Sequence, residues 1–143
     1  MNENNSGAVL RIIDANLNRL REALRVIEEY FRFINGNEDV SIQLKLIRHS
    51  LEELDKEFDL ENLLKSRDTD TDPFAEKNRK EELYRTDIIS ILTANFKRSQ
   101  EAARVLEEYS KITNMSQLSE KAKSIRFTLY ALEKKVMEKH LDE

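Results

Sequence analysis

Asn, Arg and Glu recur together at helical spacing in two places along the chain. Asn16, Arg19 and Glu22 are three residues apart, so in a helix they form one strip beside the apolar face. The same strip returns later as Asn95, Arg98 and Glu101. At the edge of a core such side chains need polar partners, which ion pairs within the helix would supply. Alternatively, two strips meeting across a bundle would form a polar pocket.

Three aspartates stand at alternate positions near the middle of the chain, as Asp68, Asp70 and Asp72. An EF-hand calcium loop begins with aspartates at this spacing. Here, however, Pro73 occupies the position that needs Gly, and Arg79 occupies the position that needs Glu. We therefore reject an EF-hand. Magnesium held by one or two of these carboxylates plus substrate phosphates remains open, since magnesium needs few protein ligands. The alternative is that Asp and Thr side chains cap a neighbouring helix.

Arginines offer a second kind of site. Arg48, Arg67, Arg85 and Arg126 would form an anion-binding cluster if they converge, whereas a single Arg is usually a surface ion pair. The sequence has no Gly-rich phosphate loop, so a phosphate would depend on Arg, Lys and helix N-termini.

Helices must position these residues, since Gly occurs twice and Pro once in 143 residues. Apolar residues recur every three or four positions, which predicts four long amphipathic helices. We place the first two helices at about 7–35 and 39–58, followed by a short helical turn at 60–65. The third helix begins between residues 78 and 86 and ends near 111, and the fourth runs over about 114–138 with Asn114 as its N-cap. Asn35-Gly36-Asn37 is the expected end of the first helix.

An internal repeat organises the chain. DANLNRLREALRVIEEY (14–30) and TANFKRSQEAARVLEEY (93–109) are identical at more than half of their positions. The predicted fold is therefore all-α, a single-domain antiparallel bundle of two duplicated helical hairpins with pseudo-twofold symmetry. The domain covers 1–143, with repeat 1 at about 8–58, a linking loop at 59–77 and repeat 2 at 78–141.

The repeat keeps polar residues while apolar ones drift. Leu20 becomes Ser99 and Leu24 becomes Ala103, whereas the Asn–Arg–Glu strip is unchanged. A bundle duplicated only for packing would preserve apolar character instead. Arg25 also recurs, and we interpret it as an ion-pair partner of the Glu residues that follow it.

Composition excludes several classes of protein. A charged fraction of 36% with net charge -4 gives a solvated surface without general affinity for nucleic acid. The absence of Cys excludes disulfides and thiolate metal sites and fits a cytoplasmic location. We expect no membrane span and no secretory signal, because no long apolar run occurs.

Three stretches in this order resemble one family: RIIDANLNRLREALRVIEEYFRF, SRDTDTDPF and YRTDIISILTANFKRSQEAARVLEEY. They are similar to the small monofunctional hydroxymethylpyrimidine phosphate kinases of bacterial thiamine biosynthesis, whose relatives also occur fused ahead of thiamine phosphate synthase. The resemblance implies phosphoryl transfer from a nucleoside triphosphate, ATP with Mg²⁺, to 4-amino-5-hydroxymethyl-2-methylpyrimidine phosphate.

That reaction needs arginines and a metal to neutralise two anionic groups. As catalytic phosphate clamps we predict Arg19, Arg67 and Arg98. As magnesium ligands we predict Asp68 and Asp72. As substrate-binding residues we predict Asn16, Glu22, Thr69, Arg85, Asn95 and Glu101.

Two other functions remain open at this point. The chain could be a non-enzymatic helical module that docks on thiamine phosphate synthase, as the fused relatives suggest. It could also be a helical enzyme like chorismate mutase, which binds a dicarboxylate without ATP or metal. The R-I-I-D segment is faintly similar to that class of enzyme.

Overall fold

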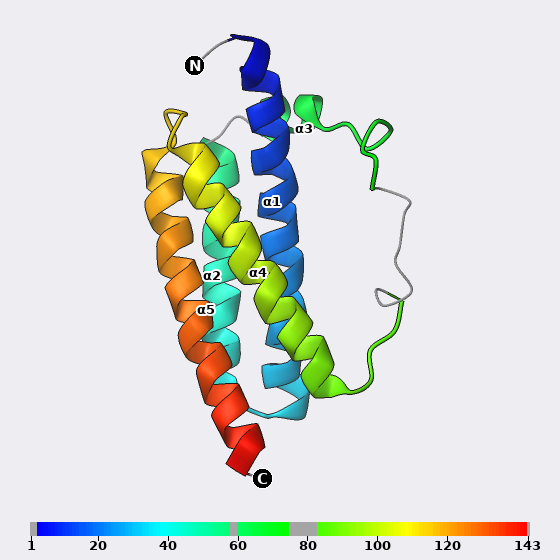
Figure 1. The fold of residues 1–143 in the computed structure, drawn as a ribbon. Helices are drawn as coiled ribbons and strands as arrows, with labels where there is room; N and C mark the ends of the chain where they lie inside the picture. Colours follow the sequence, from blue (N-terminus) through cyan, green and yellow to red (C-terminus); the bar gives the residue numbers. More distant parts are fainter. Residues whose placement is uncertain (1–2, 58–59, 75–82, 143) are drawn as a thin grey trace.

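The described chain is helical, as predicted. The computed structural model describes residues 3–57, 60–74 and 83–142 (Figure 1). Its elements are α1 (Glu3–Glu29), the π-helical turn η1 (Tyr30–Ile34), α2 (Glu38–Glu57), α3 (Leu60–Ser66), α4 (Ile88–Ser110) and α5 (Ser116–Asp142). The all-α class is confirmed, and among the described residues no helix is long and apolar enough to cross a membrane.

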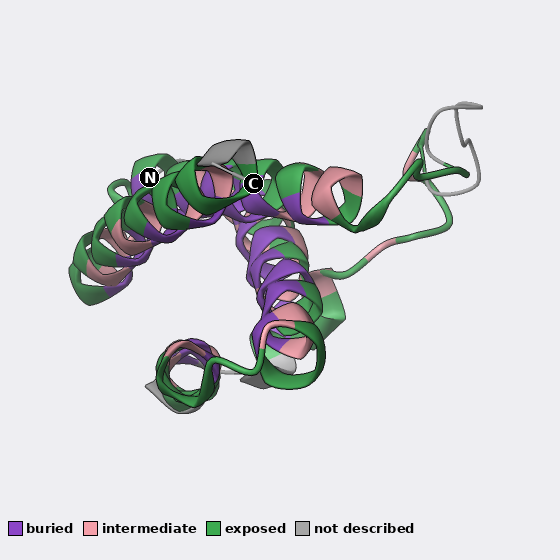
Figure 2. Ribbon diagram, turned by 90° about the horizontal axis from the view of Figure 1, so that it is seen from below, coloured by how far each residue is buried: buried purple, intermediate pink, exposed green. Residues whose placement is uncertain are grey.

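Helices α1 and α4 form the centre of the molecule. They pack against each other more extensively than any other pair, while α2 returns along α1 and α5 returns along α4 (Figure 1). The helices turn their buried faces toward one another (Figure 2). The predicted bundle of two hairpins is therefore present. The twofold axis and the domain and repeat boundaries stay predictions, and the predicted start of repeat 2 at residue 78 lies outside the described residues.

The predicted apolar stripes form the core. On α1 the residues Ile13, Leu17, Leu20, Leu24 and Ile27 are almost inaccessible to solvent. On α5 the buried apolar residues recur every three or four positions, as the predicted periodicity requires, namely Leu118, Ala122, Ile125, Leu129, Leu132 and Val136. The periodicity is less regular at the start of α4, because its first residue, Ile88, is 45% exposed.

Two positions of the repeat that hold large apolar residues on α1 hold small residues on α4. Ser99 and Ala103 of α4 are fully buried, as are Leu20 and Leu24 at the matching positions of α1. A close-packed interface constrains the summed volume of facing side chains, so large residues on one helix suit small ones on the other. A change of residue size between the repeats is therefore compatible with a close-packed core.

The first helix ends where the sequence predicted. The Asn35 amide donates to the Tyr30 carbonyl at 2.9 Å, which closes a π-helical turn. Gly36 then takes a φ of 71°, a conformation that residues with a Cβ rarely adopt. The Asn37 side chain accepts from the Val40 amide at 3.1 Å and caps α2.

Two predicted helix starts were wrong. Helix α4 begins at Ile88, later than expected, because Asp87 and Ser90 form a reciprocal capping box. Helix α5 begins at Ser116, so Met115 rather than Asn114 precedes it. The Met115 amide there donates to the Thr113 hydroxyl at 3.0 Å.

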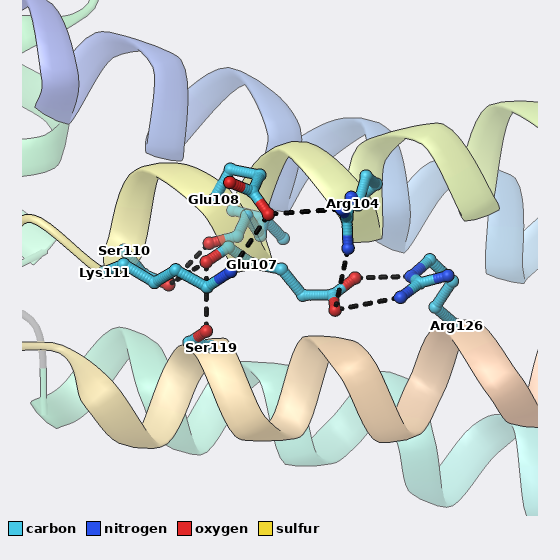
Figure 3. A network of polar contacts seen from close by, with 8 residues as sticks. Arg104, Glu107, Glu108, Ser110, Lys111, Ser119 and Arg126 are labelled. Carbon is cyan, nitrogen blue, oxygen red and sulfur yellow. Dashed lines mark hydrogen bonds and ion pairs between the residues drawn. The ribbon is translucent and has the colours of Figure 1, made fainter.

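Buried carboxylates join the two helices of each hairpin. Glu107 of α4 accepts a bidentate interaction from Arg126 of α5, whose Nη2 lies 3.0 Å from Oε1 (Figure 3). In the first hairpin Arg48 of α2 donates to Glu28 of α1 at 3.1 Å. Both Glu residues are at most 4% exposed. The Glu107 carboxylate raises the pKa of Arg126 through this hydrogen bond, with a further contribution from Tyr130.

The same Glu107 has a second, more exposed partner that provides a control. Arg104 lies 3.7 Å from it and its side chain is 57% exposed. We predict that Arg126→Gln lowers the free energy of unfolding by about 3 kcal/mol, because it leaves a buried carboxylate without its main partner. Arg104→Gln should cost less than about 1 kcal/mol. Urea denaturation followed by circular dichroism measures both, and equal losses would contradict the distinction.

Candidate functional site

One hollow lies between the first half of α1 and the loop that follows α3. Its volume is about 510 Å³, and Asn16 and Arg19 of α1 line it together with Asp68, Thr69 and Asp72 of the loop. The structure thus brings together residues from two of the predicted groups, although about fifty positions separate them in the sequence.

An ion pair holds the loop against α1. Arg67 donates to both carboxylate oxygens of Asp14, through Nε and Nη2, each at 2.8 Å. Asp14 is buried, and this hydrogen bonding raises the pKa of Arg67. A second bond runs from Arg11 Nη2 to the Asp68 carbonyl at 3.1 Å. The loop is therefore positioned by charge-assisted hydrogen bonds to one face of α1.

The aspartates of the loop stabilise its turn. Asp68 accepts from the backbone amide of Thr71 at 3.1 Å and also from its hydroxyl, and these bonds lower the pKa of Asp68. Asp72 accepts from the Phe74 amide at 3.0 Å. Among the described residues no three or more His, Asp or Glu side chains form a group that could hold a metal. Magnesium at Asp68 and Asp72 would need ligand phosphates to complete its shell, and it stays a prediction.

A second hollow adjoins the first and lies between α1 and α4. Its volume is about 350 Å³, and it shares Asn16 and Arg19 with the first hollow. Four basic side chains border it against the single carboxylate of Glu101, namely Arg19, Arg85, Lys97 and Arg98. Lys97 also pairs with Glu133 at 3.5 Å. This balance of charge favours an anion.

Asn16 links the helix backbone to the arginine beside it. Its amide nitrogen donates to the Ile12 carbonyl at 2.8 Å, and its oxygen accepts from Arg19 Nη1 at 3.4 Å. Asn16 is only 4% exposed, so this geometry is fixed by its surroundings. Asn95 bonds to the Ile91 carbonyl at 2.9 Å in the same manner.

The comparison with known families covers most of the chain. Residues 11–135 match the ThiD2 family. The chain belongs to this family. No solved structure matches it significantly.

Several curated relatives of this ThiD2 chain carry the name thiamine-phosphate synthase. The protein from Thermosynechococcus vestitus is 45% identical over 86% of the chain and 34% of its own length. Those from Nostoc punctiforme and Synechocystis sp. are 41% and 39% identical over 90% and 88% of the chain, and the match covers 35% of each relative. The ThiD2 chain therefore spans about a third of the relatives it matches.

These findings correct the predicted activity. The resemblance to a family of thiamine biosynthesis is confirmed at the level of the ThiD2 family. The prediction that the chain is a hydroxymethylpyrimidine phosphate kinase is wrong, because the relatives are named for a synthase and correspond to the chain over only part of their length. The resemblance rested on the repeated helical motif and on the SRDTDTDPF segment between its two copies, which identify the domain and not the reaction.

The structure places the remaining predicted residues as follows. Glu22 is exposed and Asn95 is partly buried, and neither is among the residues that line the two hollows. The four arginines that could have formed an anion-binding cluster do not line one hollow, and Arg48 and Arg126 instead pair with the buried Glu residues of the hairpins. Of that cluster, Arg67 lines the first hollow and Arg85 the second.

Arg11, Asp14 and Lys97 are among the polar residues at the two hollows that were not predicted from the sequence. Asp14 is an acid within an otherwise apolar helix face, and its counterpart in the second repeat is Thr93. A buried carboxylate at an edge position requires a cationic partner. That departure from the repeat was the signal available in the sequence.

Asp14 is predicted to control access to the loop. To cleave after Arg67, trypsin must bind the Arg67 side chain in its specificity pocket. In the folded protein Asp14 binds that guanidinium and so opposes cleavage. We expect Asp14→Asn to speed cleavage after Arg67 by about tenfold, because it weakens a charge-assisted interaction. Timed proteolysis with mass spectrometry measures the rate, and the exposed Asp39→Asn is the control. An unchanged cleavage rate would remove Asp14 from this role.

The pKa of Asp68 is predicted to depend on Thr71. Folding lowers the pKa of Asp68, so the ionised carboxylate stabilises the turn at pH values above about 3.9, the ordinary pKa of Asp. That stability is lost as the pH falls through the lowered pKa of Asp68 in the folded protein. Thr71→Val removes the hydroxyl donor and should raise the pKa of Asp68. Carbon-13 NMR of the carboxyl group measures the titration, and Thr69→Val in the same loop should leave it unchanged. A shift of equal size in both variants would refute the assignment.

Proposed function

We propose that this chain is a helical module that acts together with a thiamine-phosphate synthase in making thiamine phosphate. The observation that carries the proposal is the pattern of matches. Relatives named thiamine-phosphate synthase match most of this chain but only about a third of their own length. The module thus corresponds to one part of each of these longer relatives. In this proposal it works together with a protein that corresponds to the remaining part.

The fold supports a module of this kind. The chain has a core of its own, built on α1 and α4, and does not need a second domain to bury its apolar stripes. It also leaves large apolar side chains exposed on α2 and α5, including Leu46, Phe127 and Tyr130. Exposed aromatic and aliphatic side chains are common at the centres of protein interfaces.

The two adjoining hollows give the module a ligand site in this proposal. Thiamine phosphate, which the relatives' name mentions, carries a phosphate. Arg19 and Arg98 border one hollow from opposite helices, and their guanidinium groups suit phosphate oxygens. Glu101 and Asn16 would accept and donate hydrogen bonds to the rest of the molecule. A phosphorylated small molecule is therefore the ligand class we propose, with Mg²⁺ at Asp68 and Asp72 as an accessory.

The association with a synthase is tested by mixing the two proteins. We expect this chain and the thiamine-phosphate synthase of the same organism to form a one-to-one complex and the turnover of the synthase to change. Analytical ultracentrifugation measures the complex, and a steady-state assay measures the turnover. The mixture is studied at about 100 μM of each protein, so that a weak, transient interface is also detected. The proposal would be wrong if the two proteins sediment separately and the kinetics of the synthase do not change.

The ligand site is tested with matched arginine variants. We expect Arg19→Gln and Arg98→Gln each to weaken binding of thiamine phosphate by about tenfold or more, because each removes a charged donor. Arg25→Gln and Arg104→Gln are the controls, since they occupy the same repeat but pair with Glu29 and Glu108 on the surface. Isothermal titration calorimetry compares the four variants. Equal effects in both pairs would show that the hollow is not the site.

A further inference from the structure

A separate cavity lies at the end of the molecule where four elements meet. The turn η1, the start of α2, the start of α4 and the end of α5 converge there (Figure 1). The cavity has a volume of about 350 Å³ and shares no residue with the two hollows described above. We call it the basal cavity.

The floor of the basal cavity is apolar. Phe31, Leu132 and Val136 line it and are each at most 8% exposed, while Ile88 stands at its mouth with 45% exposure. The ring of Tyr30 meets that of Phe31 edge to face, with centroids 5.1 Å apart. A floor of this kind accepts an apolar or aromatic group.

The rim of the basal cavity is basic. Lys135, Lys139 and His140 line it, and all three come from the end of α5. No Asp or Glu is among the lining residues, although the chain has 28 acidic residues and a net charge of -4. Basic residues also suit the C-terminus of a helix, but that preference does not require them to face a cavity. Their convergence on an apolar floor is a second feature that the helix dipole does not explain.

The π-helical turn contributes to the shape of this cavity. Tyr30, Phe31 and Ile34 belong to the turn and line the cavity together. A single π-helical turn is rare within helices and occurs often at functional sites, since it redirects side chains at a cost in stability. Here it supplies Phe31 to the apolar floor.

We propose that the basal cavity binds a small aromatic or heteroaromatic molecule that carries one anionic group. The ring lies on the floor formed by Phe31, Leu132 and Val136, and the anion faces Lys135 and Lys139. The volume is at the lower end of the range for ligand pockets, which limits the ligand to about one ring and its charged substituent. This site is additional to the proposed phosphate site, and its occupancy does not depend on Arg19 or Arg98.

The experiment is an NMR titration of the full chain with phenyl phosphate. We expect the methyl signals of Ile88, Leu132 and Val136 to shift in a saturable manner. Inorganic phosphate or benzyl alcohol alone should shift them far less, because each supplies only half of the recognised chemistry. Benzoate in a parallel titration distinguishes a carboxylate from a phosphate as the preferred anion.

Variants separate the rim from the floor. Replacing both Lys135 and Lys139 by Gln should weaken binding by about tenfold, since each exposed cation contributes about threefold. Lys134→Gln, on the same helix but paired with Glu138 and outside the cavity, should have no effect. Ile88→Trp should fill the mouth and abolish binding, and because Ile88 is partly exposed the fold should tolerate it.

Three outcomes would overturn the proposal. The first is equal binding of phenyl phosphate and benzyl alcohol, which would leave the basic rim without a role. The second is equal weakening by the Lys134 variant and the rim variants. The third is the absence of shifts with every small probe while a thiamine-phosphate synthase shifts the same methyl signals, which would make the cavity a protein contact. Loss of the phosphate site in Arg19→Gln would leave these titrations unchanged, so the two proposals fail independently.

Discussion

The packing of α1 against α4 is the interaction on which the rest of the structure depends. Among the described elements these two helices pack against each other most extensively, and each also packs against one outer helix. Ser99 and Ala103 of α4 and Leu20 and Leu24 of α1 are all fully buried in the core that the two helices share. The same packing brings Arg19 and Arg98 to the border of one hollow. A core interaction between the two halves of the chain therefore also determines the geometry of the candidate ligand site.

The polar residues of the repeat separate into two groups by their position around the helix. Those facing the outer helices are structural: Glu28 and Glu107 are buried and each binds an arginine of its hairpin partner. A buried carboxylate with a fixed partner disfavours other registers of the hairpin, because any slip would leave a charge uncompensated. Those facing the junction of α1 and α4, such as Asn16 and Arg19, border the hollows instead. The repeat thus retained polar residues for two different reasons.

Sequence periodicity was sufficient to predict the helices, since apolar side chains must face a core and recur every three or four residues. It predicted the end of the first helix at Gly36 because few residues adopt a positive φ. It failed at the start of α4, where the local bond between Asp87 and Ser90 decided the boundary. It also missed Asp14, because a pairing with Arg67 across the fold leaves no local pattern. The activity was out of reach for a related reason: a helical motif identifies a domain, whereas a reaction depends on groups that converge only in three dimensions.

The duplicated motif does not produce two equivalent sites. Asn16 and Asn95 each bond to a carbonyl four residues earlier, but only Asn16 borders the hollows described here. The difference begins at the position two residues earlier in each repeat. In the first repeat Asp14 binds Arg67 and draws a loop over α1, whereas Thr93 in the second donates its hydroxyl to the Ile89 carbonyl of its own helix. This difference between the repeats places the loop beside Asn16, whereas Asn95 is partly buried and borders neither hollow. On this basis we propose one composite site shared by α1, α4 and the loop, to which both repeats contribute cations: Arg19 from α1, and Lys97 and Arg98 from α4.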